Sequence, residues 1–196
     1  MLTREQNTTA PGSKLLLLLV LFFTCSPLKA QTSKPCKVTL EAPNPASSLV
    51  LDLGSSKRSY SLADELNLTA LLRNECTVER IFVGAQLRWG SGSGMVLRIE
   101  DASGQEVKSP IDNLPGPPLL DDPAPLVGLR LGQTFGIRLK GPARDFFPSP
   151  GKYRVQVIYS SVLRRDLVNG AFQNLNILWQ GHDPIASPWI NVKVTP

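Results

Sequence analysis

The chain contains one histidine, His182, and histidine is the residue on which most hydrolytic triads and many zinc sites depend. A Ser-His-Asp triad needs that histidine held by a carboxylate and in contact with an activated serine. Asp183 follows His182 directly, but adjacency along the chain does not give that geometry. No G-x-S-x-G elbow occurs either. The run His182-Asp183-Pro184 therefore indicates a turn, and a single histidine excludes zinc sites of the three-histidine type.

Three pairs of carboxylates could suggest glycosidase chemistry, which places two such groups about 5–10 Å apart across a cleft. The pairs are Asp64-Glu65, Glu100-Asp101 and Asp121-Asp122. Sequence neighbours on a strand point to opposite faces, which makes Glu100-Asp101 a poor pair. Asp121-Asp122 lies in a proline-rich segment, where backbone carbonyls could complete a Ca²⁺ site. A solvated acidic loop is the simpler interpretation, and we expect neither a catalytic residue, nor a metal, nor a cofactor.

Aromatic and glycine-rich segments offer the remaining candidates for binding. The run from Arg88 to Gly94 is rich in glycine but lacks the Lys-Ser/Thr ending of a phosphate-binding P-loop. Exposed aromatic side chains can concentrate binding energy, although they more often close the ends of a hydrophobic core. Phe146 and Phe147, directly before Pro148, are the predicted contact with a partner.

The first 30 residues are typical of an export signal. A polar segment with Arg4 and Lys14 precedes an unbroken apolar run, Leu15 to Phe23. That run is shorter than the roughly 20 residues that span a bilayer. The pattern predicts a signal peptide at residues 1–30, cleaved after Ala30, and a secreted, periplasmic or cell-surface protein without membrane insertion. Two alternatives stay open: an uncleaved short anchor, and a bacterial lipoprotein box with a lipid on Cys25.

Charge and cysteine content limit the partners of the exported chain. The sequence carries 21 basic and 16 acidic residues, and the basic residues are scattered rather than gathered in a stripe. This argues against a nucleic-acid partner. Cleavage removes Cys25 and leaves Cys36 and Cys76, an even number that suggests a disulfide in an exported protein. Two free buried thiols are the alternative.

The organisation beyond the signal is one of short alternating segments separated by turns. Residues 31–35 are expected to be a flexible N-terminus, and residues 36–196 to be one domain. Alternation of apolar and polar residues predicts strands, and Ala102 to Gln105 is expected to be a hairpin turn. A weak helical pattern covers residues 162–170. The predicted strands are residues 36–41, 49–53, 66–72, 80–83, 95–101, 135–139, 153–159 and 189–194.

A proline-rich segment interrupts this series at residues 109–127, where six prolines occur. Proline lacks a backbone donor and fixes φ, so this segment is expected to be a long exposed loop and not a central strand. Short strands at this spacing indicate an all-β fold. We predict an antiparallel sandwich of about seven to nine strands, with this long loop and at most one short helix.

Two motifs resemble bacterial exported immunoglobulin-like domains. The segment Leu66 to Asn74 resembles an early core strand of that family, and Pro150 to Val157 resembles its late PGxYxVxV strand. The resemblance implies an immunoglobulin-like sandwich in which Tyr153 forms a tyrosine corner, its hydroxyl bonded to nearby backbone. The proline-rich loop and residues 160–179 are longer than usual for the family. Cys36 and Cys76 also depart from the antibody pattern of an inter-sheet disulfide.

The sequence therefore favours a non-enzymatic exported module that binds or structurally supports a protein or cell-surface component. Fold alone fixes no activity. The alternative is a carbohydrate-binding module or a hydrolase whose site lies on the irregular loops.

Overall fold

The computed structural model describes residues 44–90, 94–114, 126–163 and 175–196. These residues form eleven strands and three short helical segments. The strands are β1 (Leu49–Ser55), β2 (Ser59–Ser61), β3 (Glu65–Asn74), β4 (Ile81–Gly84), β5 (Gly94–Asp101), β6 (Glu106–Val107), β7 (Leu126–Leu129), β8 (Thr134–Pro142), β9 (Gly151–Ser160), β10 (Ile185–Ala186) and β11 (Ile190–Thr195). The helices are α1 (Pro45–Ser48), α2 (Ala143–Phe146) and the 3₁₀ segment η1 (Pro110–Asn113).

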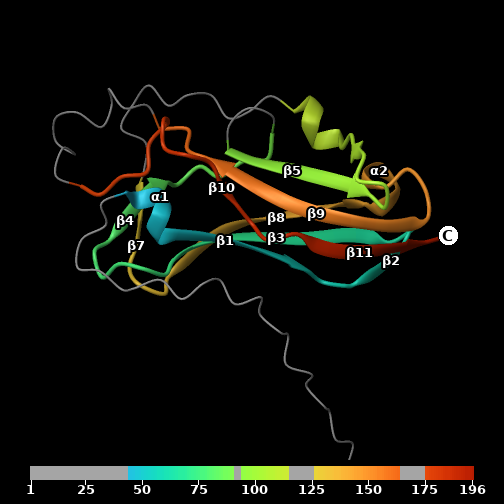
Figure 1. Ribbon diagram of the computed structural model, residues 1–196, viewed down its shortest axis with the longest axis horizontal. Coiled ribbons are helices and arrows are strands. Elements are labelled where there is room, and N and C mark those ends of the chain that lie inside the picture. Colours follow the sequence, from blue (N-terminus) through green and yellow to red (C-terminus); the bar gives the residue numbers. More distant parts are fainter. Residues whose placement is uncertain (1–43, 91–93, 115–125, 164–174) are drawn as a thin grey trace, which may run out of the picture. The chain divides into compact units, whose positions relative to one another are not determined.

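The strands pair into two main sheets and a small third one (Figure 1). The first has the order β1-β3-β8, and the second has the order β2-β11-β9-β5-β6, with β10 paired to β9. The third sheet pairs β4 with β7. Every pairing is antiparallel except that of β11 with β2.

This strand order is that of an immunoglobulin-like sandwich. In that fold the first, second, fifth and fourth strands share one sheet, and the third, sixth and seventh share the other; the described sheet β1-β3-β8 has no strand in the fourth place. Here β1, β3 and β8 occupy the first set of places, and β5, β9 and β11 occupy the second. The predicted all-β antiparallel sandwich is confirmed.

Side-chain alternation explains how the two main sheets share a core. Leu66, Leu68, Ala70 and Leu72 of β3 are all fully buried, and the residues between them are partly exposed. On β9 the residues from Tyr153 to Tyr159 alternate in the same way. Because successive strand residues face opposite sides of a sheet, each sheet turns one apolar face inward. The inward residues of both sheets join one continuous hydrophobic cluster.

The buried amide of Asn74 fixes the end of β3. Asn74 is fully buried. Its Nδ2 donates to the carbonyls of Thr77 and Leu129 at 3.1 and 3.0 Å, and its Oδ1 accepts from the Thr77 amide. These bonds join the loop after β3 to the end of β7, and they satisfy polar groups that burial would otherwise penalise.

Seven predicted strands are found as β1, β3, β4, β5, β8, β9 and β11, and Gly104 lies at the predicted hairpin with a φ of 84°. The strand predicted at residues 36–41 lies outside the described residues, as does most of the predicted helix at 162–170. More strands form than the seven to nine expected. The additional strands include β2, β6 and β10, which are only two or three residues long and therefore too short to show an alternating pattern in the sequence.

Two local predictions need correction. The segment at 109–127 is not all loop, since Pro110–Asn113 forms η1 and β7 begins at Leu126. Helices α1 and α2 exceed the single short helix expected; each has four residues. Asn44 starts α1 by accepting a hydrogen bond from the Ala46 amide, and Pro45 suits the first turn.

Within the described ranges no helix is long and apolar enough to cross a membrane.

Candidate functional site

The outward side of the six-stranded sheet gathers charged and polar side chains from three adjacent strands. Its members alternate with the buried residues of β5, β9 and β11, so the same pleat that builds the core presents them to solvent. We call this surface the charged face. It comprises Arg98, Glu100, Lys152, Arg154, Gln156, Trp189, Asn191 and Lys193.

Glu100 is the anionic centre of the charged face, with a side chain only 9% exposed. It lies directly across from Arg154 in the β5–β9 pairing. Arg154 Nε donates to Glu100 Oε2 at 2.6 Å, and Arg98 Nη2 donates to Oε1 at 3.3 Å. Each carboxylate oxygen therefore holds one arginine, which is the arrangement that makes charge-assisted hydrogen bonds strong.

Trp189, just before β11, packs against both arginines. The guanidinium carbon of Arg154 lies 4.7 Å from the ring centroid, and that of Arg98 lies at 5.6 Å. Both distances are within the range of cation–π attraction. The indole and the carboxylate thus position the same two guanidinium groups, which fixes side chains that would otherwise move freely.

Two lysines meet beside this cluster. Lys152 of β9 and Lys193 of β11 are directly paired, and both are exposed. Among the residues that the structure describes, neither lysine forms an ion pair. Like charges directly opposite each other destabilise a sheet, so this pair costs stability in the isolated molecule.

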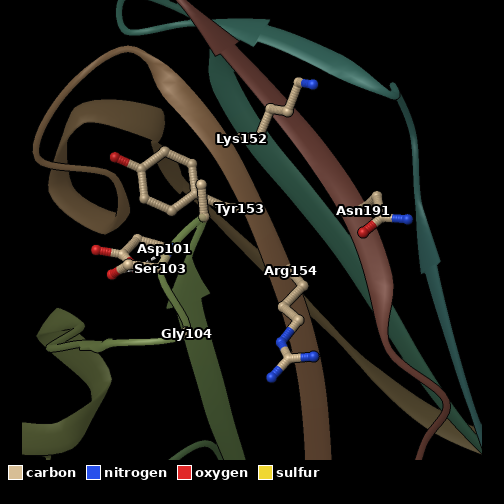
Figure 2. A pocket seen from close by; sticks show the side chains of 8 residues that line it. Asp101, Ser103, Gly104, Lys152, Tyr153, Arg154 and Asn191 are labelled. Atoms are coloured by element: carbon tan, nitrogen blue, oxygen red, sulfur yellow. Dashed lines mark hydrogen bonds between the residues drawn. The ribbon is translucent and has the colours of Figure 1, made fainter.

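An open pocket of about 440 Å³ is lined in part by Lys152. Figure 2 shows Lys152 and Arg154 on β9, Asn191 on β11 beside them, and the turn from Asp101 to Gly104 on the other side of β9. Asp101 is committed to its own turn: Oδ1 accepts from the Ser103 hydroxyl and from the amides of Ser103 and Gln105. The Ser103 hydroxyl bond, with these amide bonds, lowers the pKa of the Asp101 carboxyl below its usual value.

His182 lies in a turn, as its sequence context predicted. Its Nδ1 accepts a hydrogen bond of 3.2 Å from the Trp179 amide, and the two rings pack with centroids 4.6 Å apart. Gly181 between them has a φ of 116°, and a side chain there would collide with the Trp179 ring. The imidazole therefore closes this turn, and no bond from it to a serine or carboxylate is found among the described residues.

The predicted partner contact at Phe146 and Phe147 is wrong. These side chains are only 4% and 1% exposed. The cause is α2, a single turn anchored by the hydrogen bond from the Ala143 amide to the Asp64 carbonyl. This turn directs both rings into the core, where the Phe147 and Tyr153 centroids lie 4.9 Å apart.

Tyr153 makes the backbone contact that a tyrosine corner requires. Its hydroxyl donates to the carbonyl of Ser149 at 2.8 Å, four residues upstream. The bond closes the connection between α2 and β9. The side chain itself is 6% exposed, so ring burial and this hydrogen bond act together.

The other candidates are dispersed or fall outside the described residues. Asp64 and Glu65 diverge, with Asp64 bound to Lys57 at 3.0 Å and Glu65 to Lys140 at 3.6 Å. Asp121-Asp122, Cys25 and Cys36 lie outside the described part of the chain. Cys76 is 7% exposed, and its predicted bond to Cys36 stays a prediction. Across the described ranges, no group of three or more histidine, cysteine or acidic side chains is placed to hold a metal ion.

Comparisons with known proteins do not assign a family. No family model matches the chain, and no curated protein matches it. Among solved structures, the CARDB domain of the PF1109 protein from Pyrococcus furiosus, in complex with di-metal ions, is 9% identical over 74% of this chain and 91% of its own, with a TM-score of 0.33. The b-glucosidase EmGH1 from Erythrobacter marinus is 13% identical over 76% of this chain and 15% of its own, with a TM-score of 0.36. Similarities this low carry no argument, and the strand order alone supports the fold.

Sequence reasoning missed the charged face altogether. Its residues are spread from Arg98 to Lys193, and only the pairing of β5, β9 and β11 brings them together. The available signal was the run of charged residues at the outward positions of predicted strands, such as Arg98 and Glu100. The strand register that joins them cannot be read from one sequence.

Proposed function

We propose that this chain is an exported, non-enzymatic immunoglobulin-like module that binds a protein or cell-surface component through its charged face. The observation that carries this proposal is the assembly of Trp189, Arg98 and Arg154 around the nearly buried Glu100 on an open sheet surface. Tryptophan and arginine dominate the energetic centres of protein interfaces. His182 closes a turn, where its Nδ1 accepts a hydrogen bond from the Trp179 amide.

Export is part of the proposal and rests on residues 1–30. The short apolar run and the small residue at the end of this segment support cleavage after Ala30. A module that acts outside the cytoplasm would meet its partner there. Lipidation of Cys25 is the alternative outcome, and it would place the same domain on a membrane surface.

In-cell photo-crosslinking of the full-length chain, with mass spectrometry, tests the proposal. A photo-reactive amino acid in place of Gln156, on the charged face, is expected to trap a discrete partner outside the cytoplasm. The same experiment reports the mature N-terminus, expected at Gln31 or, if lipidated, at Cys25.

The matched control places the photo-reactive residue at Arg138, an exposed position on β8 of the opposite sheet. Equal cross-linking at both positions would contradict binding through the charged face. A full-length chain that keeps residues 1–30 in the cytoplasm would contradict export.

A further inference from the structure

We propose that the Lys152–Lys193 pair is a docking site for an acidic segment of a partner protein. This inference deepens the proposed function and rests on it, because it names the part of the charged face that meets the partner and the chemistry that it recognises.

The first support is an electrostatic cost that the isolated domain does not offset. The sheet register places Lys152 directly opposite Lys193, and both ammonium groups are without a carboxylate among the described residues. Two of the other described lysines do have acidic neighbours, since Lys57 contacts Asp64 and Lys140 contacts Glu65, whereas Lys108 forms no ion pair among the described residues. A partner carboxylate between the two lysines would convert this repulsion into two attractions.

The second support is the charge balance around the pair. Glu100 neutralises part of the positive charge of Arg98 and Arg154, and the Glu106 carboxylate lies 3.9 Å from Arg98. Four cations face three carboxylates in this region when Asp101 is counted, which leaves one net positive charge, and Lys152 and Lys193 are the cations that form no ion pair among the described residues. The neighbouring Asp101 carboxylate is occupied by its own turn. A negatively charged ligand is therefore the complementary one.

The third support is the spacing of the cations along β9. Lys152 and Arg154 are two residues apart on one face of a strand, which separates their Cα atoms by about 6.6 Å. Alternate residues of an extended peptide repeat at the same distance. A segment with acidic residues at alternate positions would meet both cations, with the open pocket at Asn191 beside it.

The composition of the charged face favours a protein over a membrane as the source of this charge. Trp189 is half-buried and held by two arginines, so it is a fixed contact and not a flexible membrane anchor. A rigid aromatic and arginine centre with a polar rim is the anatomy of a protein interface.

A binding titration of the full chain after export tests this inference. The probe is a fluorescently labelled peptide of alternating serine and glutamate, and the control probe replaces each glutamate with glutamine. Fluorescence anisotropy at about 0.15 M ionic strength is expected to detect the acidic peptide only. The double variant Lys152→Gln/Lys193→Gln is expected to weaken that binding by about tenfold or more.

A matched double variant, Arg138→Gln/Lys140→Gln, removes two exposed charges from the opposite sheet and is expected to bind as the native chain does. Reversing the charge of the site with Lys152→Glu/Lys193→Glu is expected to abolish binding of the acidic peptide and to create binding of a peptide of alternating serine and lysine. Circular dichroism and thermal unfolding verify that each variant folds.

Three results would overturn the inference. The first is that the acidic peptide does not bind. The second is that Lys152→Gln/Lys193→Gln and Arg138→Gln/Lys140→Gln weaken peptide binding equally. The third is that the chain binds phosphatidylglycerol vesicles but not the peptide. If the peptide fails while photo-crosslinks still form at Gln156, the proposed function stands and only the acidic-segment inference falls. If both fail, the charged face is not the binding surface.

Discussion

Glu100 on β5 and Arg154 on β9 are direct cross-strand partners, joined by a hydrogen bond of 2.6 Å from Nε to Oε2. The carboxylate is nearly buried, whereas the arginine side chain is 50% exposed. The pair therefore stands between a surface ion pair, which contributes little, and a buried one, which is costly to break. Its position makes it the structural support of the charged face.

We expect Glu100→Gln to lower the free energy of unfolding by about 1 kcal/mol, a value reduced for solvent screening of the arginines. Glutamine keeps the shape of the side chain but removes the charge that both arginines share. Urea denaturation measures the change. The control is Glu106→Gln, whose carboxylate is 66% exposed and 3.9 Å from Arg98; it should alter stability little. Equal effects of the two variants would contradict a central role for Glu100.

Lys193→Gln is expected to raise stability by about 0.5 kcal/mol, because it removes a like charge directly opposite Lys152. The gain should shrink at high salt, where surface repulsion is screened. Chemical denaturation at low and high ionic strength measures both effects. Lys140→Gln, which removes a lysine paired with Glu65, should give no gain. Stabilisation by both substitutions alike would argue for a general effect of net charge.

Tyr153→Phe keeps the ring packed against Phe147 but removes the hydrogen bond to the Ser149 carbonyl. We expect a loss of about 1 kcal/mol, the usual contribution of such a bond. Thermal unfolding measures it. Because the acceptor is backbone, Ser149→Ala should have a much smaller effect. If Ser149→Ala destabilises as much as Tyr153→Phe, the corner depends on the serine side chain instead.

The fold was predictable because alternation along a strand is a local property. Leu66, Leu68 and Leu72 show their common face in the sequence, and that face is buried in the sandwich. Segments such as β2 and β10 escaped prediction because two or three residues are too few to show a period.

The candidate site was not predictable, because it depends on register between distant strands. Lys152 and Lys193 are 41 positions apart by their numbering, and nothing in either local sequence shows that they meet. Phe146 and Phe147 show a different error, a contact surface that was predicted but is buried. Two adjacent aromatic residues before a proline favoured an exposed loop, but the unpredicted turn of α2 directs both rings into the core.

Tyr159 predicts a loss of stability in alkaline solution. Burial raises the pKa of its hydroxyl to about 12, against an ordinary value of 10.0. The unfolded chain therefore releases this proton first, and stability should be fully retained below pH 10 and fall as the pH rises toward about 12. Denaturant unfolding across this range measures the slope. Tyr159→Phe should show a shallower decline, and an unchanged slope would assign the effect to other groups.

The predicted bond between Cys36 and Cys76 would tie the start of the domain to the loop that Asn74 holds in place. Cys76 is buried, and the adjacent Thr77 is bonded to Asn74, so this attachment point is well ordered. Closing a loop of about 40 residues should contribute roughly 3–4 kcal/mol. Mass spectrometry of the exported protein, alkylated under denaturing but non-reducing conditions, should find both cysteines unmodified. Cys36→Ser and Cys76→Ser should each lower stability, and adding a reductant should then have no further effect. Alkylation of both thiols without reduction would overturn the bond and favour two free buried cysteines.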